Sequence, residues 1–336
     1  MIEAFQLSKQ FGSFTAVDRI DLEVRPGELL ALLGPNGAGK TTTVRMLGAI
    51  LRPSSGQARI CGLDVVTHAQ AVRGKVGLLT EYPGLYGRMP AMEYLDFFGA
   101  LLGLDPHVRR RRAEALLRQF GLWEARERKL DSYSKGMRQK VALVRALIHD
   151  PPVLYLDEPT TAMDPQSARV VRDAIGELRN AERSILLTTH NLAEAETLAD
   201  RIAIISGGRI IALGSFAELS RQLLGAPRYA LRLAPGHHAA TLPALIGDLV
   251  TVEAVDGEGV SFRCAEPHLV NPQILARLAA HGLAVVTLAE VPSSLEEVYL
   301  RIVSEESSDR RRDTGPDRSG VTATELGPGL VKVKSS

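Results

Sequence analysis

The sequence predicts an α/β domain with a largely parallel sheet, followed by a smaller α+β domain. Over residues 1–225, short apolar runs of strand length alternate with segments whose apolar residues recur at helical spacing. From residue 226 the pattern changes to short strands separated by two helical segments. A chain of 336 residues is long enough for one large domain and one small domain.

Four runs in the first domain, predicted to span residues 1–225, are the clearest candidates for buried strands. They are strand-length apolar runs at residues 29–33, 153–157, 185–189 and 202–205. Between them, residues 113–120 and 138–148 carry apolar side chains at helical spacing. Ser134 precedes the second of these helices and is a favourable N-cap residue.

The smaller domain is predicted to span residues 226–303. Its strands are expected at residues 229–233, 250–255, 260–264 and 283–288, and its helices at 242–246 and 272–281, with a last helix at 294–303. The order β-α-β-β-α-β is typical of the ferredoxin-like fold. Residues 304–336 have too little apolar content to offset the entropy of ordering, so they are predicted to form a disordered tail. The arginines at 310–312 are interpreted as a solvated charge run.

Composition excludes several classes of protein. The net charge of +1 argues against nucleic-acid binding, which requires a strong basic excess. Cys61 and Cys264 are far apart and give neither a disulfide framework nor metal-ligand spacing, which fits a reducing compartment. The opening MIEAFQLSKQF does not resemble a secretory signal, and no apolar stretch is long enough to span a membrane. We therefore expect a cytoplasmic chain that reaches a membrane only through a partner.

The segment GPNGAGKTT fits the phosphate-loop pattern G-x-x-x-x-G-K-[ST]. Its glycines allow backbone N–H groups to surround a β-phosphate, Lys40 can reach the β- and γ-phosphates, and the Thr41 hydroxyl can ligate Mg²⁺. An Asn-Lys-x-Asp stretch, which guanine-specific proteins use, is absent from the sequence, so ATP is favoured over GTP. The predicted ATP-binding residues of the loop are Gly34, Pro35, Asn36, Gly37, Ala38, Gly39, Lys40, Thr41 and Thr42.

Two acidic residues follow the apolar run in PPVLYLDEPT. Asp157 ends the predicted strand, where a carboxylate would hold the shell of a Mg²⁺ ion. Glu158 comes next and would polarise an attacking water molecule as a general base. Together with the phosphate loop, this pair predicts a magnesium-dependent site that hydrolyses ATP.

The stretch YSKGMRQKVALVRALIHDPPVLYLDEPTTAMD resembles the ATPases of ATP-binding cassette (ABC) transporters. Their signature motif, LSGGQ, lies one helix before the acidic strand, and here it corresponds to Tyr133-Ser134-Lys135-Gly136-Met137. The resemblance covers residues 2–220 and implies a P-loop NTPase fold with an antiparallel β subdomain and an α-helical subdomain at about residues 88–150. The segment ending VPSSLEEVYLRIV is similar to the appended domain of drug-export-type cassettes.

The resemblance also implies roles for residues outside the phosphate loop. Phe11 corresponds to the aromatic residue that stacks on adenine, although Phe14 lies close enough to serve instead. Asp164 lies in the loop that crosses to the partner subunit, and His190 corresponds to the switch histidine that contacts the γ-phosphate. Signature residues that close over the ATP of the partner subunit are Ser134, Lys135, Gly136 and Met137.

One position departs from the family pattern. Glu81, in VGLLTEYPGLYG, stands where the family carries a glutamine that contacts the metal ion. The carboxylate keeps an oxygen ligand suited to Mg²⁺ and adds a negative charge near the phosphates. The predicted metal ligands are therefore Thr41, Glu81 and Asp157, and the expected cofactors are ATP and Mg²⁺.

The resemblance implies that two such chains, identical or different, form a head-to-tail dimer around two ATP molecules. This dimer is expected to drive a separate integral membrane permease from the inner face of the cell membrane, for export of a drug-like or lipophilic compound. Tyr82, Tyr86 and the stretch EYLDFFGALLG flank the groove that receives a helix of the permease in this family, but ordinary packing explains each of them equally well.

Three alternative functions are consistent with parts of the pattern. A soluble ABC-type ATPase of DNA repair or translation would usually carry coiled-coil insertions or two fused cassettes, and neither is present. A P-loop kinase for a small molecule would lack the signature motif and His190. A degenerate cassette would bind ATP but hydrolyse it poorly, and the intact Glu158 and His190 argue against this alternative.

Overall fold

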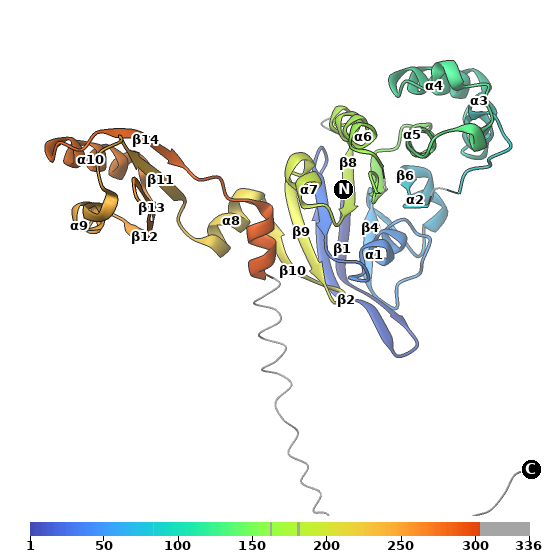
Figure 1. Ribbon diagram of the computed structural model, residues 1–336. Helices are drawn as coiled ribbons and strands as arrows, with labels where there is room; N and C mark the ends of the chain where they lie inside the picture. Colours follow the sequence, from blue (N-terminus) through green and yellow to red (C-terminus); the bar gives the residue numbers. More distant parts are fainter. Residues whose placement is uncertain (83, 162, 180–181, 303–336) are drawn as a thin grey trace, which may run out of the picture.

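The computed structural model describes residues 1–82, 84–161, 163–179 and 182–302. Two sheets and a group of helices form the larger part of the chain, and a third sheet with two helices forms the C-terminal part (Figure 1). The predicted tail at 304–336, with the arginines at 310–312, lies outside the described residues.

A six-stranded sheet with the order β10-β9-β3-β8-β7-β6 forms the centre of the first domain. Only β10 is antiparallel to its neighbour among these six strands. The strands are β3 (Leu29–Leu33), β6 (Val76–Leu79), β7 (Val153–Asp157), β8 (Ser184–Thr189), β9 (Arg201–Ser206) and β10 (Arg209–Gly214). The four strands predicted from apolar runs are confirmed as β3, β7, β8 and β9, and every residue of β3, β7 and β8 is buried.

Helices cover both faces of this sheet, which explains why its strands are apolar at successive positions rather than at alternate ones. Val153 and Tyr155 of β7 share a core with helix α1 (Lys40–Leu47), whereas Leu154 and Leu156 pack with α5 (Lys135–Leu147) and α6 (Pro165–Glu177). Successive side chains of a strand point to opposite faces, so these two sets lie on opposite sides of the sheet. The helix α7 (Leu192–Leu198) follows β8.

A second sheet is antiparallel and has the order β2-β1-β4-β5. Its strands are β1 (Ile2–Phe11), β2 (Phe14–Val24), β4 (Ser55–Ile60) and β5 (Leu63–Asp64), and α2 (Ala69–Lys75) leads from it to β6. The turn between β1 and β2 places Phe11 opposite Phe14. Both aromatic rings therefore project from the same end of this sheet.

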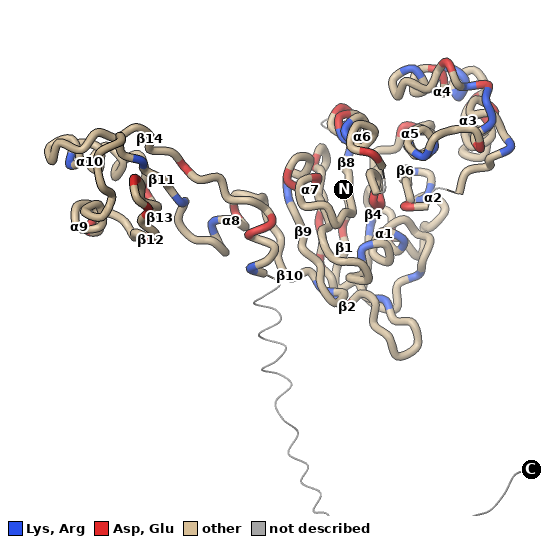
Figure 2. Tube along the Cα trace, viewed as in Figure 1, with Lys and Arg blue, Asp and Glu red and all other residues tan. Residues whose placement is uncertain are grey.

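A group of helices lies to one side of the central sheet (Figure 1). It contains α3 (Ala91–Leu101), α4 (Pro106–Gln119) and α5, with short 3₁₀ turns η1 (Trp123–Ala125) and η2 (Leu130–Ser132). The helix α4 begins at Pro106 and not at Ala113, because the Asp105 side chain accepts the His107 N–H at 2.8 Å and caps the helix. Arginines gather along α4 (Figure 2), and one of them, Arg112, pairs with Asp150 at 3.3 Å.

The C-terminal sheet has the order β12-β13-β11-β14, and all its pairings are antiparallel. The helix α8 (Phe216–Leu224) leads into it, and its elements are β11 (Arg228–Leu233), η3 (Ala239–Thr241), α9 (Leu242–Ile246), β12 (Thr251–Val255), β13 (Gly259–Arg263), α10 (Pro267–Ala280) and β14 (Val285–Glu290). The start predicted for α10 is wrong by five residues, because Pro267 and not Pro272 takes the first turn and Pro272 lies within the helix.

The last described helical segment, residues 295–302, packs its buried side chains against the first domain. Leu295, Val298 and Ile302 share a core with Leu33 of β3 and Ile204 of β9. Figure 1 shows this segment beside α8 and β10, in red. The last helix of the domain predicted at 226–303 therefore shares a core with the first domain, because the spacing of its apolar residues presents a stripe to β3 and β9.

No helix of the described residues is both long enough and apolar enough to cross a membrane.

We predict that Leu295→Ala lowers the stability of the first domain by about 2 to 5 kcal/mol, because it leaves a cavity in a core that includes β3 and β9. Leu295 is 0% exposed, whereas Leu300 on the same helix is 60% exposed and Leu300→Ala is the matched control. Urea unfolding followed by fluorescence of Trp123, the single tryptophan, reports on the first domain. An unchanged midpoint for Leu295→Ala would show that this helix does not stabilise the first domain.

Candidate functional site

The phosphate loop connects β3 to α1, and its backbone leaves no room for a side chain at Gly34 and Gly39. A Cβ atom on Gly34 would lie 2.3 Å from the Ile205 carbonyl oxygen, and one on Gly39 would lie 2.6 Å from the Ala16 carbonyl oxygen. Gly37 and Gly39 also have positive φ angles, 81° and 108°, which L-residues rarely adopt. These three glycines are therefore required by geometry, as expected of a loop whose N–H groups surround a phosphate.

Lys40 begins α1 and is buried, at 6% exposure. Its Nζ donates to the carbonyl oxygens of Gly34 at 2.7 Å and Pro35 at 3.2 Å. The same atom lies 3.3 Å from Oε1 of Glu158. The lysine thus holds a positive charge inside the loop and next to the predicted general base.

Asp157 and Glu158 stand at the carboxyl end of β7, and both are buried. Asp157 Oδ1 accepts the Thr41 hydroxyl at 3.2 Å and also the Thr188 hydroxyl. The Glu158 N–H donates to the Thr188 carbonyl oxygen at 3.0 Å. Glu158 has a φ of 53°, a left-handed conformation that is costly for this residue type and is often found at functional sites.

The two carboxylate oxygens of Glu158 have different surroundings. Oε2 accepts the Thr161 hydroxyl at 2.9 Å and the Nδ1–H of His190 at 2.8 Å. Oε1 is buried and accepts no hydrogen bond, although it faces the Lys40 ammonium. A buried carboxylate oxygen without a donor is an available acceptor for a water molecule in this position.

The predicted nucleotide residues, with the exception of Gly34, line one cavity of about 410 Å³. Its walls come from five separate segments and are formed by Phe11, Phe14, Ala16, Pro35, Asn36, Gly37, Ala38, Gly39, Lys40, Thr41, Thr42, Glu81, Glu158, Thr161 and His190. Phe11 is 49% exposed and Phe14 is 63% exposed, so either ring can stack on a base. The choice between these two aromatic residues therefore stays open.

Comparisons with known proteins agree with this geometry. The profile of the ABC transporter family matches residues 17–161. Over 95% of its length, the chain is 37% identical to the daunorubicin/doxorubicin resistance ATP-binding protein DrrA of Streptomyces peucetius, of which it covers 97%. The chain belongs to the ABC transporter family.

Two further comparisons extend this assignment. The chain is 33% identical to the Nod factor export ATP-binding protein I of Ralstonia nicotianae, over 90% of this chain and 94% of that protein. A solved structure of an ATP-binding subunit of an ABC transporter is 31% identical, with a TM-score of 0.63, over 67% of this chain and 94% of that one. The first domain therefore has the fold of an ABC cassette.

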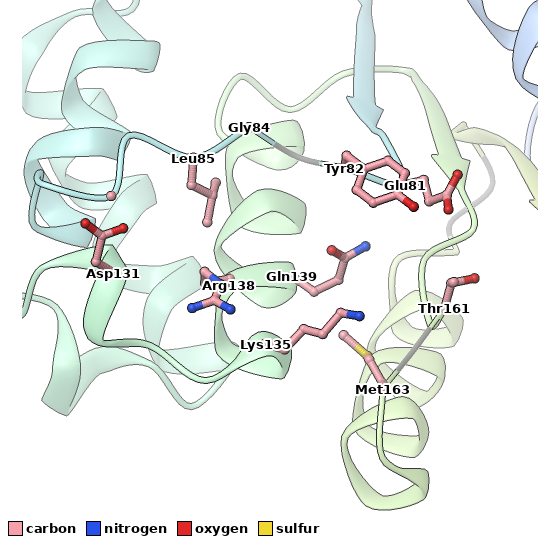
Figure 3. Close-up of a pocket in the computed structure, with 11 residues that line it drawn as sticks. Glu81, Tyr82, Gly84, Leu85, Asp131, Lys135, Arg138, Gln139, Thr161 and Met163 are labelled. Atoms are coloured by element: carbon pink, nitrogen blue, oxygen red, sulfur yellow. The ribbon is translucent and has the colours of Figure 1, made fainter.

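The signature residues of the cassette lie outside its own nucleotide cavity. Ser134 caps α5 by accepting the Met137 N–H at 3.2 Å, and Lys135 and Gly136 form the first turn. Lys135 lines a second cavity of about 330 Å³, together with Glu81 and other residues shown in Figure 3. None of the four signature residues lines the cavity that holds the phosphate loop.

Asp164 caps α6, where its carboxylate accepts the Ser167 N–H at 2.9 Å. This hydrogen bond lowers the pKa of Asp164. Gly136 packs close by, since a Cβ atom there would lie 2.9 Å from the Ser167 hydroxyl. The start of α5 and the start of α6 are therefore neighbours, and Gly136 lets them approach closely.

The predicted metal ligands fit a Mg²⁺ ion only in part. Thr41 and Asp157 are in direct contact, and Glu81 lines the same cavity as Thr41. In the described part of the chain, no three His, Cys, Asp or Glu residues form a metal-binding group. Mg²⁺ usually keeps several waters and phosphate oxygens beside one or two protein ligands, so a hydroxyl and a carboxylate suit it without a complete protein cage.

Sequence reasoning missed three residues that support the site. Thr188 pairs in register with Asp157 on the neighbouring strand, and Thr161 donates to Glu158. Glu194 is buried on α7 and accepts the Thr160 hydroxyl at 2.9 Å. The polar end of the run SILLTT was a signal for Thr188. The sequence contained no signal for Glu194, because the burial of this residue depends on how α7 packs.

We predict that Glu194→Gln raises the urea midpoint of unfolding at pH 8. Burial raises the pKa of Glu194, so the folded chain binds this proton more tightly than the unfolded chain does. The free energy of unfolding of the wild type therefore falls as the pH rises from the pKa of a glutamate in the unfolded chain through the raised pKa of Glu194 in the folded chain. Glutamine carries no titrating group, so the variant does not lose stability in this way.

Urea titrations of wild type and Glu194→Gln between pH 5 and pH 8 check this prediction. The increase in the urea midpoint of the variant over that of wild type should become smaller toward pH 5. The matched control is Glu3→Gln at an exposed position. An equal gain for Glu194→Gln at all pH values would contradict a shifted ionisation of this carboxyl group.

Proposed function

We propose that this chain is the ATP-hydrolysing subunit of an ABC exporter and drives a separate membrane permease. One observation carries the proposal: Lys40, Glu158 and His190 meet in a single cavity with the phosphate loop, and Thr41 connects that loop to Asp157. These contacts join groups that bind phosphate, position a metal and accept a proton. The proposed cofactors are ATP and Mg²⁺.

Hydrolysis would use the two oxygens of Glu158 differently. Oε2 is held by Thr161 and His190, so the carboxylate cannot turn freely. Oε1 has no hydrogen-bond donor and would take the proton of the attacking water. Bound ATP would supply the phosphoanhydride bond, and bound Mg²⁺ would neutralise part of its charge. Lys40 would exchange its contact with Glu158 for phosphate oxygens, which frees Oε1 for its task as a base.

The proposed metal residues are Thr41, Asp157 and Glu81. Thr41 and Asp157 are already in contact, and Thr188 orients the Asp157 carboxylate. Glu81, which lines the same cavity as Thr41, would add a third oxygen ligand. Because its negative charge repels phosphates when no metal is present, we propose that ATP binding by this cassette depends unusually strongly on Mg²⁺.

Two chains would act as a head-to-tail dimer, either of identical or of different cassettes. The location of Ser134, Lys135, Gly136 and Met137 outside their own nucleotide cavity supports this, because a second chain is then needed to bring a signature motif to each ATP. The helix N-terminus at Ser134 is suited to a phosphate. Asp164, at the start of α6 beside this signature motif, would contact the partner subunit.

The proposed cargo is a drug-like or lipophilic compound, and the direction is export. Relatives named for daunorubicin and doxorubicin resistance and for Nod factor export support this proposal. The cassette would lie on the cytoplasmic face of the cell membrane, bound to its permease. The β11–β14 sheet, with its β-α-β-β-α-β order, supports a ferredoxin-like domain that begins near residue 226 and ends before the helix at 295–302.

A soluble ABC-type ATPase without a permease is the alternative. Purification of the tagged full chain from detergent-solubilised membranes separates the two functions. Recovery of an integral membrane protein in stoichiometric amounts supports transport, and recovery of the cassette alone would count against it.

We predict that Glu158→Gln reduces ATP hydrolysis by about 100-fold or more, because the amide cannot accept the proton of the attacking water. ATP affinity should remain close to that of wild type, since Lys40 and the phosphate loop are unchanged. Phosphate release measures turnover, and calorimetric titration measures binding. Full turnover in this variant would exclude Glu158 as the base and favour another residue of the cavity.

We predict that Glu81→Gln makes ATP binding less dependent on Mg²⁺, chiefly by improving affinity without metal by about tenfold, because a repulsive charge near the phosphates is removed. The measurement compares ATP affinity with and without Mg²⁺ in wild type and variant. Equal Mg²⁺ dependence in the two proteins would mean that Glu81 is no ligand and only lines the loop.

A further inference from the structure

Glu194 is a buried carboxyl group that the proposed hydrolysis does not use. It lies in the first turn of α7 and is 1% exposed. Glutamate is almost never fully buried unless its carboxylate has partners. Glu194 is not among the described residues that line the nucleotide cavity, so any effect it has on the reaction would pass through its neighbours.

The hydrogen bonds of Glu194 join two segments that carry site residues. Its carboxylate accepts the Thr160 hydroxyl at 2.9 Å, and the Thr189 side chain also hydrogen-bonds to this carboxyl group. Thr160 lies two residues after Glu158, and Thr189 immediately precedes His190. One buried side chain thus contacts the chain next to each member of the Glu158–His190 pair.

The connection from Thr160 to Glu158 is short and stiff. Pro159 lies between them, is buried, and has a ring that fixes its φ at about −65°. The Thr161 N–H donates to the Glu158 carbonyl oxygen at 3.2 Å and closes the turn. Because the left-handed backbone of Glu158 needs support from its surroundings, a fixed position for Thr160 helps to hold the Glu158 carboxylate in place.

The connection from Thr189 to His190 is equally short. Thr189 ends β8 and is 1% exposed, and its hydroxyl oxygen accepts the Asn191 N–H at 3.0 Å. The Asn191 side chain in turn accepts the Glu194 N–H at 3.3 Å. The chain is therefore held on both sides of His190. The imidazole itself is half exposed and donates to Glu158 at 2.8 Å.

We propose that Glu194 is a positioning residue for hydrolysis, and that through Thr160 and Thr189 it fixes Glu158 and His190 at hydrogen-bonding distance from each other. The reaction is the ATP hydrolysis proposed above, so this positioning role rests on that function. Glu194 does not hold the phosphate loop. Its loss should therefore slow turnover and leave ATP binding unchanged.

Two substitutions of Glu194 separate the hydrogen bonds from the packing. Glutamine keeps a carbonyl oxygen that can accept the Thr160 hydroxyl, and its amide can donate to the Thr189 hydroxyl oxygen. Glu194→Gln should therefore keep kcat within about threefold of wild type. Leucine has a similar size but no acceptor, so Glu194→Leu should lower kcat by about tenfold or more, because a small misplacement of reacting groups is costly. The KM for ATP should stay within about twofold of wild type in both variants.

Thr160→Val breaks the same hydrogen bond from the other partner and decides the question even if Glu194→Leu does not fold. It should lower kcat by about fivefold or more at an unchanged KM for ATP. The matched control is Thr197→Val, because Thr197 is exposed on α7 and donates to the Ala193 carbonyl oxygen at 2.7 Å. This control should keep the kcat of wild type. If Glu194 acts through Thr160, the double variant should lose less than the product of the two single losses.

Nuclear magnetic resonance of the full chain with labelled histidine reports on the pair directly. The His190 signal is the one that disappears in His190→Gln. It should keep its chemical shift in Glu194→Gln and move in Glu194→Leu and Thr160→Val.

Four results would contradict the positioning role while wild type hydrolyses ATP. They are wild-type kcat in Thr160→Val, an equal loss of kcat in Glu194→Gln and Glu194→Leu, an unmoved His190 signal in every variant, and a loss of kcat that only follows a fall in the urea midpoint. Absence of ATP hydrolysis in wild type would instead refute the proposed function itself, and the positioning role with it.

Discussion

The contact between the ends of β7 and β8 holds the catalytic end of this cassette together. Thr188 of β8 donates its hydroxyl to Asp157 and accepts the Glu158 N–H through its carbonyl oxygen. These two bonds support the left-handed backbone of Glu158, which would otherwise be costly. The Glu158 carboxylate contacts Lys40 and His190. The position of the proposed general base therefore depends on a neighbouring strand as well as on its own.

The parallel direction of the central strands explains why residues far apart in sequence meet in one cavity. In parallel strands all carboxyl ends lie at one edge of the sheet, and ligands bind there. The phosphate loop follows β3, Asp157 ends β7 and His190 follows β8. Register pairs Leu33 with Thr189 and Asp157 with Thr188, so these three segments end at the same level. The site is a consequence of sheet polarity and register together.

Glu81 connects this site to the helical part of the molecule. It follows β6, the edge strand next to β7, and it lines both the nucleotide cavity and the cavity at the start of α5. In that position Glu81 adds a negative charge that a glutamine would not carry. The substitution thus leaves the family assignment unchanged and places a carboxylate in the loop after β6, which borders both cavities.

The sequence by itself determined the features that depend on contiguous residues. The glycines and Lys40 of the phosphate loop, the buried strands β3 and β7, the Asp157-Glu158 pair and the Ser134 cap each follow from local chemistry. Tertiary structure alone decided which groups complete the site. Three features depend on packing between distant segments: the partners Thr161 and Glu194, the packing of the helix at 295–302 against the first domain, and the position of Glu81 in the lining of two cavities. A side chain's burial and partners are set by the elements that fold against it, and this information is absent from any short stretch of sequence.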